Sequence, residues 1–298
     1  MQVDPNYVTK LASAIGASSA REQVLTNQLS SGLRVATLSD DPVAASSNVL
    51  LMSSMARIDA FTQSANRDQS LLQVSDSALG EVVNQVTSAL TLAVSAGNST
   101  MSAANLSAVG RQLADIRDNV LSLANTSYQG TYVFAGSQGK TQPFKLDTST
   151  SPATASYAGD NATQSLETPD GQKVQVSVPG SGVFMASGAD LMGALNRLAA
   201  DVSGGVTANV KADTAALTQA LANVSQQRST IGSAMSRLTV TTGYEATQKT
   251  MLQARQSDML SADPAAVATQ LKTAEVQHQA LLGVESALSQ TNLFSYLK

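Results

Sequence analysis

The chain has 298 residues, a formal net charge of −4, 13% charged residues and no cysteine. Without cysteine, disulfides, thiolate metal sites and cysteine nucleophiles are excluded, and an acidic balance without basic runs argues against nucleic acid as a partner. Because only 4% of residues are aromatic and none is tryptophan, we do not expect a large enzyme-like core.

The N-terminal segment, residues 1–40, has the spacing of a helix that packs on a partner helix. The positions fall alternately four and three residues apart, at Leu11, Ile15, Ser18, Glu22, Leu25 and Leu29. Lys10 precedes a run that is too polar and short for a secretion signal. No apolar run reaches the length needed to span a bilayer. We therefore expect a helix, with neither a cleaved leader nor a membrane anchor.

A helix break follows this segment. Gly32 supplies a permissive backbone where the helix can end, and Asp41 before Pro42 is typical of an N-cap with proline at the first helical position. Asp40 and Asp41 form an adjacent acidic pair, but such a pair lacks the spaced oxygen ligands of a calcium loop. The sequence therefore predicts capping here and not metal binding.

Helical spacing resumes between residues 41 and 130, where two antiparallel helices separated near Gly97 are predicted, the second with Ser102 as its cap. Residues 131–188 then form a predicted β-rich insert, with strands at Tyr132–Phe134 and at an alternating valine run ending at Val178. Helices return in residues 189–260 and in a C-terminal segment, residues 261–298. The predicted fold class is mainly α, with a long antiparallel helical bundle or coiled coil formed by both chain ends and a small β domain in the middle.

Candidate catalytic and cofactor motifs fail on spacing. Gly136–Thr141 resembles a phosphate-binding loop, but Phe134 stands at the first glycine position and Pro143 opposes the helix that must follow. His278 is the single histidine and lies in heptad register, so a helix contact explains it better than catalysis. We expect no catalytic residue, no metal, no cofactor and no enzymatic activity.

Residues at both ends and in the insert give the chain a resemblance to the bacterial flagellin family. The N-terminal signature comprises residues 28–35, which include Arg34, followed by residues 39–45. Within the family, residues 132–137, 142–144 and 157–160 are similar to the members that join hook to filament. Asp263–Ala266 opens a final helix that closes with residues 292–298, as in those members.

The resemblance implies a structural role without a reaction. Subunits would form a homo-oligomeric ring between hook and filament, with the first hook-associated protein and flagellin as axial neighbours. It implies export through the flagellar apparatus to the cell exterior without a cleaved signal, with a cytoplasmic chaperone on the C-terminal segment. Candidate subunit-interface residues are Leu11, Ile15, Leu25, Leu29, Leu271, Leu281, Leu288, Leu293 and Phe294. The candidate helix-break motif comprises Gly32, Arg34, Asp40, Asp41 and Pro42.

Two other hypotheses remain open. Flagellin itself would polymerise along the filament, but the Phe-Ala-Gly segment at residues 134–136 and the tail at residues 293–297 disfavour it. A cytoplasmic coiled-coil binding module would keep its amphipathic ends inside the cell, so detection in culture supernatant would argue against it.

Overall fold

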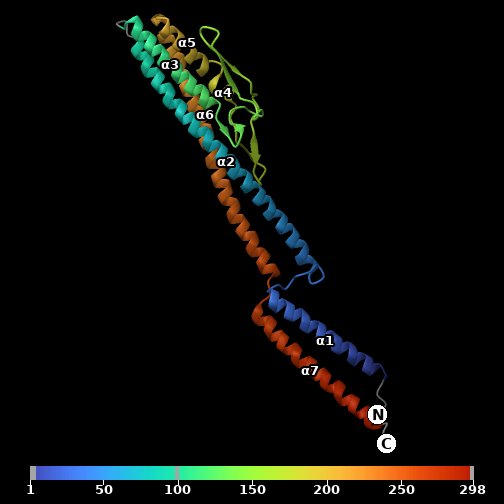
Figure 1. Cartoon of the computed structure of the whole chain (residues 1–298). Coiled ribbons are helices and arrows are strands. Elements are labelled where there is room, and N and C mark those ends of the chain that lie inside the picture. The colour runs from blue at the N-terminus through green and yellow to red at the C-terminus, as the bar shows by residue number, and fades with distance from the viewer. Residues whose placement is uncertain (1–4, 98–100, 296–298) are drawn as a thin grey trace. The chain divides into compact units, whose positions relative to one another are not determined.

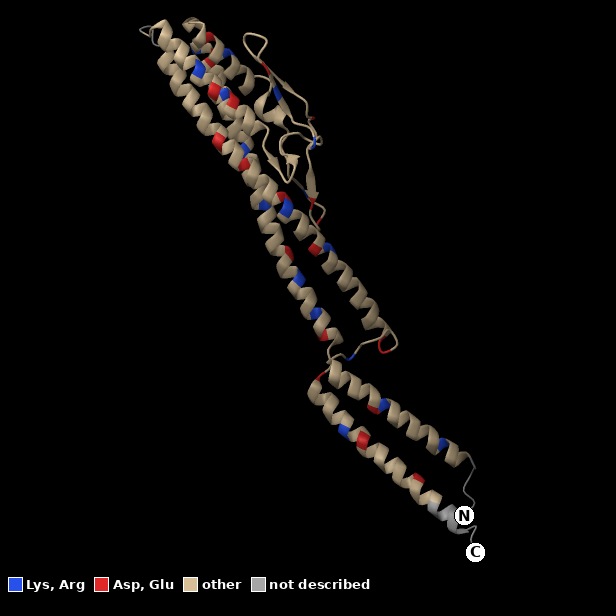
Figure 2. Cartoon of the chain, viewed as in Figure 1, with Lys and Arg blue, Asp and Glu red and all other residues tan. Residues whose placement is uncertain are grey.

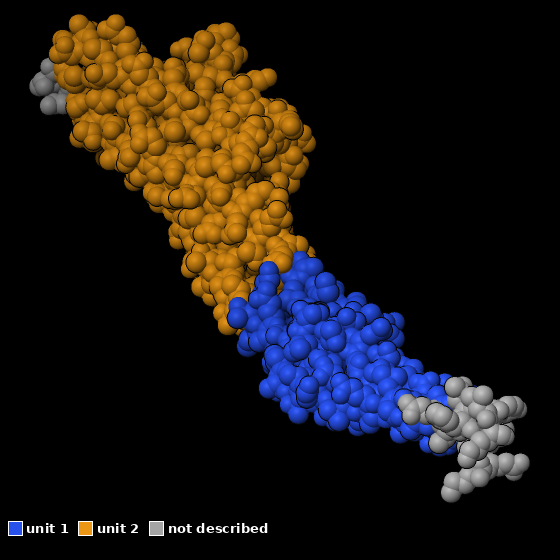
Figure 3. Space-filling model, turned by 60° about the horizontal axis from the view of Figure 1, so that its bottom comes forward, with its two compact units in different colours: residues 1–56, 248–298 blue, residues 57–247 orange. Residues whose placement is uncertain are grey.

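The structure is a computed structural model that describes residues 5–97 and 101–295, with side chains described from residue 6 to residue 289. Its contacts divide the chain into two compact units. The terminal unit comprises residues 1–56 and 248–298, and the central unit comprises residues 57–247 (Figure 3). The five-segment division expected from the sequence stays a prediction.

The helices account for most of the described chain. They are α1 (Pro5–Ser31), α2 (Pro42–Ala96), α3 (Ala103–Ala124), α4 (Gly180–Phe184), α5 (Leu191–Ser203), α6 (Thr207–Leu260) and α7 (Pro264–Ser295) (Figure 1). α2 and α7 begin at the prolines of Asp-Pro pairs. Proline suits a first helical position because the missing N–H has no intrahelical partner there.

In the terminal unit, α1 packs on α7 in an antiparallel pair (Figure 1). The fully buried apolar residues of this seam are Leu25, Val267 and Ala274, with Leu271 partly buried beside them. Side chains this small and this few bury little apolar area, so the pair has a thin core.

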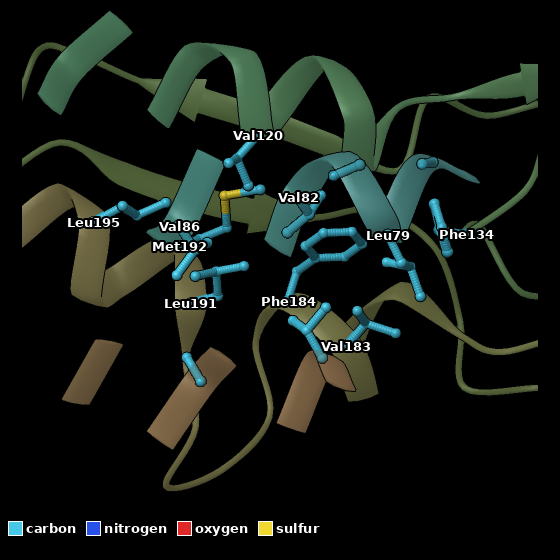
Figure 4. Close-up of a cluster of buried hydrophobic side chains, with 14 of the residues drawn as sticks. Leu79, Val82, Val86, Val120, Phe134, Val183, Phe184, Leu191, Met192 and Leu195 are labelled. Atoms are coloured by element: carbon cyan, nitrogen blue, oxygen red, sulfur yellow. The ribbon is translucent and has the colours of Figure 1, made fainter. Parts of the chain in front are cut away.

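The central unit holds the main core, formed by α2, α3, α5, α6 and the insert. Figure 4 shows Phe184 of α4 between Leu79 and Val82 of α2. The Phe184 ring meets the Phe134 ring edge to face at a centroid distance of 5.3 Å, and Phe144 packs against Phe184 at 5.2 Å. Such edge-to-face contacts stabilise aromatic clusters beyond the area they bury.

The insert contains three two-stranded antiparallel sheets. β1 (Ser127–Tyr128) pairs with β2 (Thr131–Tyr132), β3 (Phe144–Asp147) with β4 (Thr154–Tyr157), and β5 (Ser165–Glu167) with β6 (Lys173–Gln175). The predicted strand at Tyr132–Phe134 is wrong beyond Tyr132. Val133 and Phe134 instead lie in a turn that buries both side chains, because Phe134 contributes to the aromatic cluster.

The fold class predicted from the sequence is confirmed: the chain is mainly α, with a small β region in the middle. Ser102 also caps α3 as predicted, since its side chain accepts a hydrogen bond from the Asn105 N–H. Among the described helices, none combines the length and the apolar character needed to cross a membrane.

Candidate assembly surface

The helix break is a hydrogen-bonded junction between four helix ends. α1 ends where the Gly32 N–H donates to the Gln28 carbonyl at 2.9 Å, and Gly32 has a φ of +70°. The Gly32 carbonyl accepts from the Ala262 N–H at 2.9 Å, and Leu33 pairs with Ser261. The two connections of the terminal unit, α1 to α2 and α6 to α7, therefore lie side by side and share backbone hydrogen bonds.

Arg34 links the end of α6 to the start of α2. Its backbone N–H donates to the Leu260 carbonyl at 2.7 Å, and its guanidinium donates through Nη2 to the Met259 carbonyl at 3.0 Å. These carbonyls lie in the last turn of α6, where no later helical N–H is available to them. Nη1 of Arg34 donates to Asp41 Oδ2 at 3.2 Å. One side chain thus caps one helix and contacts the cap of another.

Both aspartates of the break act on backbone groups. Asp40 Oδ2 accepts from the Thr37 N–H at 2.7 Å and the Ala36 N–H at 3.0 Å, and these bonds hold the pKa of Asp40 below its ordinary value. Asp41 Oδ1 accepts from the Ala44 N–H at 3.0 Å, so it caps α2. This bond, followed by the one from Arg34, lowers the pKa of Asp41. No group of metal-ligating side chains is found within residues 5–97 and 101–295.

The candidate interface residues lie in or beside the α1·α7 seam. Leu25 is buried in it, whereas Leu29 is 42% exposed. The half-buried members are Leu11, Ile15, Leu271, Leu281 and Leu288. Leu293 and Phe294 fall outside the side chains that the structure describes. Since most of the described members are only partly covered within one chain, each retains area that another subunit could cover.

Sequence reasoning missed a second apolar face of α7. Val276 and Val284 are 58% and 42% exposed. Together with Thr269, Thr273 and Ala280 they recur three and four residues apart, out of phase with the seam that α1 covers. A helix with apolar stripes on two faces is suited to burial between two neighbours. The signal was present in the spacing, but the small threonine and alanine side chains obscured it.

The two terminal helices, α1 and α7, carry few charged side chains. Within the described residues, α1 carries Lys10, Arg21 and Glu22, and α7 carries Lys272, Glu275 and Glu285 (Figure 2). Lys272 Nζ lies 3.1 Å from Glu275 Oε2 on the surface, where such pairs contribute little. Packing against these helices therefore depends mainly on shape and apolar area.

Hydrogen bonds join the insert segments at residues 132–137 and 157–160. The carboxylate of Asp160 accepts from the Ser137 N–H at 2.7 Å and from the Ser137 hydroxyl. These bonds lower the pKa of Asp160. The Tyr157 hydroxyl lies 2.8 Å from the Asp160 carbonyl and 3.0 Å from the Phe134 carbonyl. A side chain at Gly136 would overlap the Asp160 carbonyl. Because the Asp160 carboxylate accepts the hydrogen bonds of this loop, the loop is a structural turn.

Paired terminal helices, a capped helix break and a β insert on a helical bundle define a helical protein whose apolar faces are incompletely covered within one chain. Models of the bacterial flagellin N-terminal helical region and C-terminal helical region match residues 6–139 and 214–297. The chain belongs to the bacterial flagellin family.

Two curated relatives carry the name flagellar hook-associated protein 3. The one from Salmonella typhimurium is 30% identical over 173 residues, which is 58% of this chain and 53% of the relative. The one from Escherichia coli is 34% identical over 118 residues, 39% of this chain and 37% of the relative. The alignments thus span about half and about a third of these relatives.

A solved structure shows the same fold. It is a putative flagellar hook-associated protein from Vibrio parahaemolyticus, with a TM-score of 0.67 and 19% identity. The match covers 74% of this chain and 100% of the other. At this identity the likeness establishes the fold alone.

Proposed function

We propose that this protein is a structural subunit of the bacterial flagellum that joins the hook to the flagellin filament. The observation that carries the proposal is the similarity to two relatives named flagellar hook-associated protein 3, in a chain whose two ends both match flagellin regions. The role is mechanical and involves no reaction.

The surface of the terminal unit supports a role in assembly. Its seam has only a thin core, while Leu29, Val276 and Val284 remain 42–58% exposed. Covering an exposed valine or leucine contributes roughly 1.5–3 kcal/mol, so neighbouring subunits can supply stabilisation that one chain lacks. The candidate interface residues, together with the second face of α7, are the proposed contact surface between subunits.

The partners follow from this proposal. Copies of the chain form a ring, with the first hook-associated protein on the hook side and flagellin on the filament side. The chain reaches the cell exterior through the flagellar export apparatus, and an export chaperone covers the apolar face of the C-terminal segment before export. The helix-break motif, with Arg34 at its centre, holds the terminal pair to the start of α2 in each subunit.

Deletion and complementation in the source bacterium test the role. Cells without the chain should assemble hooks but no filaments and should release flagellin into the medium, and the wild-type gene should restore filaments. If the chain is flagellin, the deletion strain will release no flagellin. If it is a cytoplasmic binding module, the protein will be absent from the supernatant of intact wild-type cells.

A matched pair of variants tests the surface. Val276→Glu places a charge on the open face of α7, and Ser286→Glu places the same charge on an exposed position outside that face. We expect Val276→Glu to reduce filament number while secretion of the variant persists, and Ser286→Glu to behave as wild type. Equal behaviour of the two variants would contradict the assignment of this face to assembly.

A further inference from the structure

α6 carries a carboxylic acid at a position built for an apolar side chain. Asp213 is 5% exposed and shares the buried face of α6 with Val210, Leu217 and Ala220. A charged carboxylate is costly at such a position unless it is paired and fully hydrogen-bonded.

The pairing of Asp213 is incomplete. Arg197 of α5 places Nε 3.5 Å from Oδ1, but the Arg197 side chain is 48% exposed, so solvent weakens this attraction. The other oxygen, Oδ2, is buried and accepts no hydrogen bond. A proton on Oδ2 would convert it into a donor and remove this deficit.

Asp201, one turn beyond Arg197 on α5, is placed to accept that proton. Arg197 contacts Asp213 and Asp201 contacts Asn209, which is one turn before Asp213 on α6, so the side chains of Asp201 and Asp213 lie next to each other. Asp201 Oδ2 accepts from Asn209 Nδ2 at 3.0 Å, and the Asp201 backbone carbonyl accepts from the Val206 N–H at 2.8 Å. Asp201 is therefore held in place by the turn that connects α5 to α6.

We propose that Asp213 and Asp201 share one proton and form a pH-sensitive latch that holds the end of α5 against the first turns of α6. In the closed latch, one proton lies between the two side chains, and the Asp213 carboxyl donates its O–H to a side-chain oxygen of Asp201. When a base in solution removes that proton, two carboxylates face each other at hydrogen-bonding distance and repel. The turn between the helices then loosens.

The direction of the pH dependence follows from the surroundings. Burial, followed by the hydrogen bond and charge of Asp201, raises the pKa of Asp213, and Arg197 opposes the increase. The other neighbouring helices add no charge nearby: Leu90–Gly97 of α2 and Ser102–Gly110 before and within α3 contain no ionisable side chain, and Arg111 is exposed. The folded state therefore retains a proton that the unfolded chain has already released above pH of about 4. Stability must fall as pH rises from there through the folded pKa.

The test follows both carboxyl groups directly in the full-length chain. We would measure ¹³Cγ chemical shifts of the aspartates across pH, with exposed Asp115 as the internal reference, and repeat the titration with Asp201→Asn. The latch predicts that the midpoint for Asp213 lies above the ordinary aspartate value of about 4, and that Asp201→Asn lowers it. Titration of Asp213 at that ordinary value, or a midpoint unchanged by Asp201→Asn, overturns the proposal.

Stability measurements test the consequence. In Asp213→Asn, the amide can donate to Asp201 at every pH, so its urea midpoint relative to wild type should rise as pH increases above about 4, until Asp213 is ionised in the folded wild type. Asp115→Asn should show no such trend. A difference between Asp213→Asn and wild type that is the same at all pH values would show that no proton is linked to this contact, and would overturn the latch.

Discussion

Gly110 of α3 lies against Ser203 of α5, and replacing it with alanine should open that contact. An alanine Cβ at this position would lie 2.8 Å from both the Cα and the N of Ser203 and would overlap the Ser203 hydroxyl. Because two of these atoms belong to the backbone, rotation of a side chain cannot relieve the overlap. Forcing a methyl group into a packed contact costs about 1–3 kcal/mol, and contact with backbone places this site near the upper end.

Helix propensity acts in the opposite direction. Alanine is favoured over glycine inside a helix by roughly 0.5–1 kcal/mol, so the expected net loss for Gly110→Ala is about 2 kcal/mol. Gly232 of α6 provides the control, because a Cβ there would have no neighbour within 4 Å. Gly232→Ala should therefore raise stability by about 0.5–1 kcal/mol.

Urea unfolding, followed by circular dichroism, measures the change in unfolding free energy for both variants. Ser203→Ala should not rescue Gly110→Ala, since the backbone overlap remains after the hydroxyl is removed. An increase in stability for Gly110→Ala similar to that for Gly232→Ala would refute the close helix contact.

The remaining predictions concern other parts of the chain. Phe184→Ala should cost about 3–5 kcal/mol in urea unfolding, because this fully buried ring joins the insert to α2. Glu245 is 1% exposed with both side-chain oxygens unpartnered, and burial, followed by the charge of Asp170, raises its pKa. The wild type should therefore lose stability relative to Glu245→Gln as pH rises above about 4, and a pH-independent difference would contradict this. Gly32→Ala should destabilise the helix break by about 1–2 kcal/mol, because alanine is strained at a φ of +70°; increased amide exchange around the break would reveal it. In the isolated wild-type chain, amides of α1 and α7 should exchange faster than those in the middle of α6, since their seam buries fewer residues.

Local sequence signals predicted much of this fold. Helix starts at Pro42 and Pro264 and the cap at Ser102 depend on interactions within a few residues, so residue type and spacing are enough to indicate them. The helical bundle and the position of the insert likewise follow from a change of period in the apolar pattern.

Contacts between distant segments could not be predicted in the same way. Val133 and Phe134 have the residue types of a strand, but the aromatic cluster with Phe184 draws them into a buried turn. Asp213 and Glu245 look like solvent-exposed helix residues until the seam of α6 is known. The bond from the Arg34 side chain to Met259 of α6 connects residues 225 positions apart, and no periodicity indicates it.

Immunogold electron microscopy of flagellated cells most directly tests the central claim, using an antibody raised against residues 131–187 of the insert. A junction subunit predicts a single band of gold where the hook meets the filament. Gold along the whole filament would identify the chain as a flagellin, and flagella without any gold, while the protein is expressed, would contradict a place for it in the flagellum.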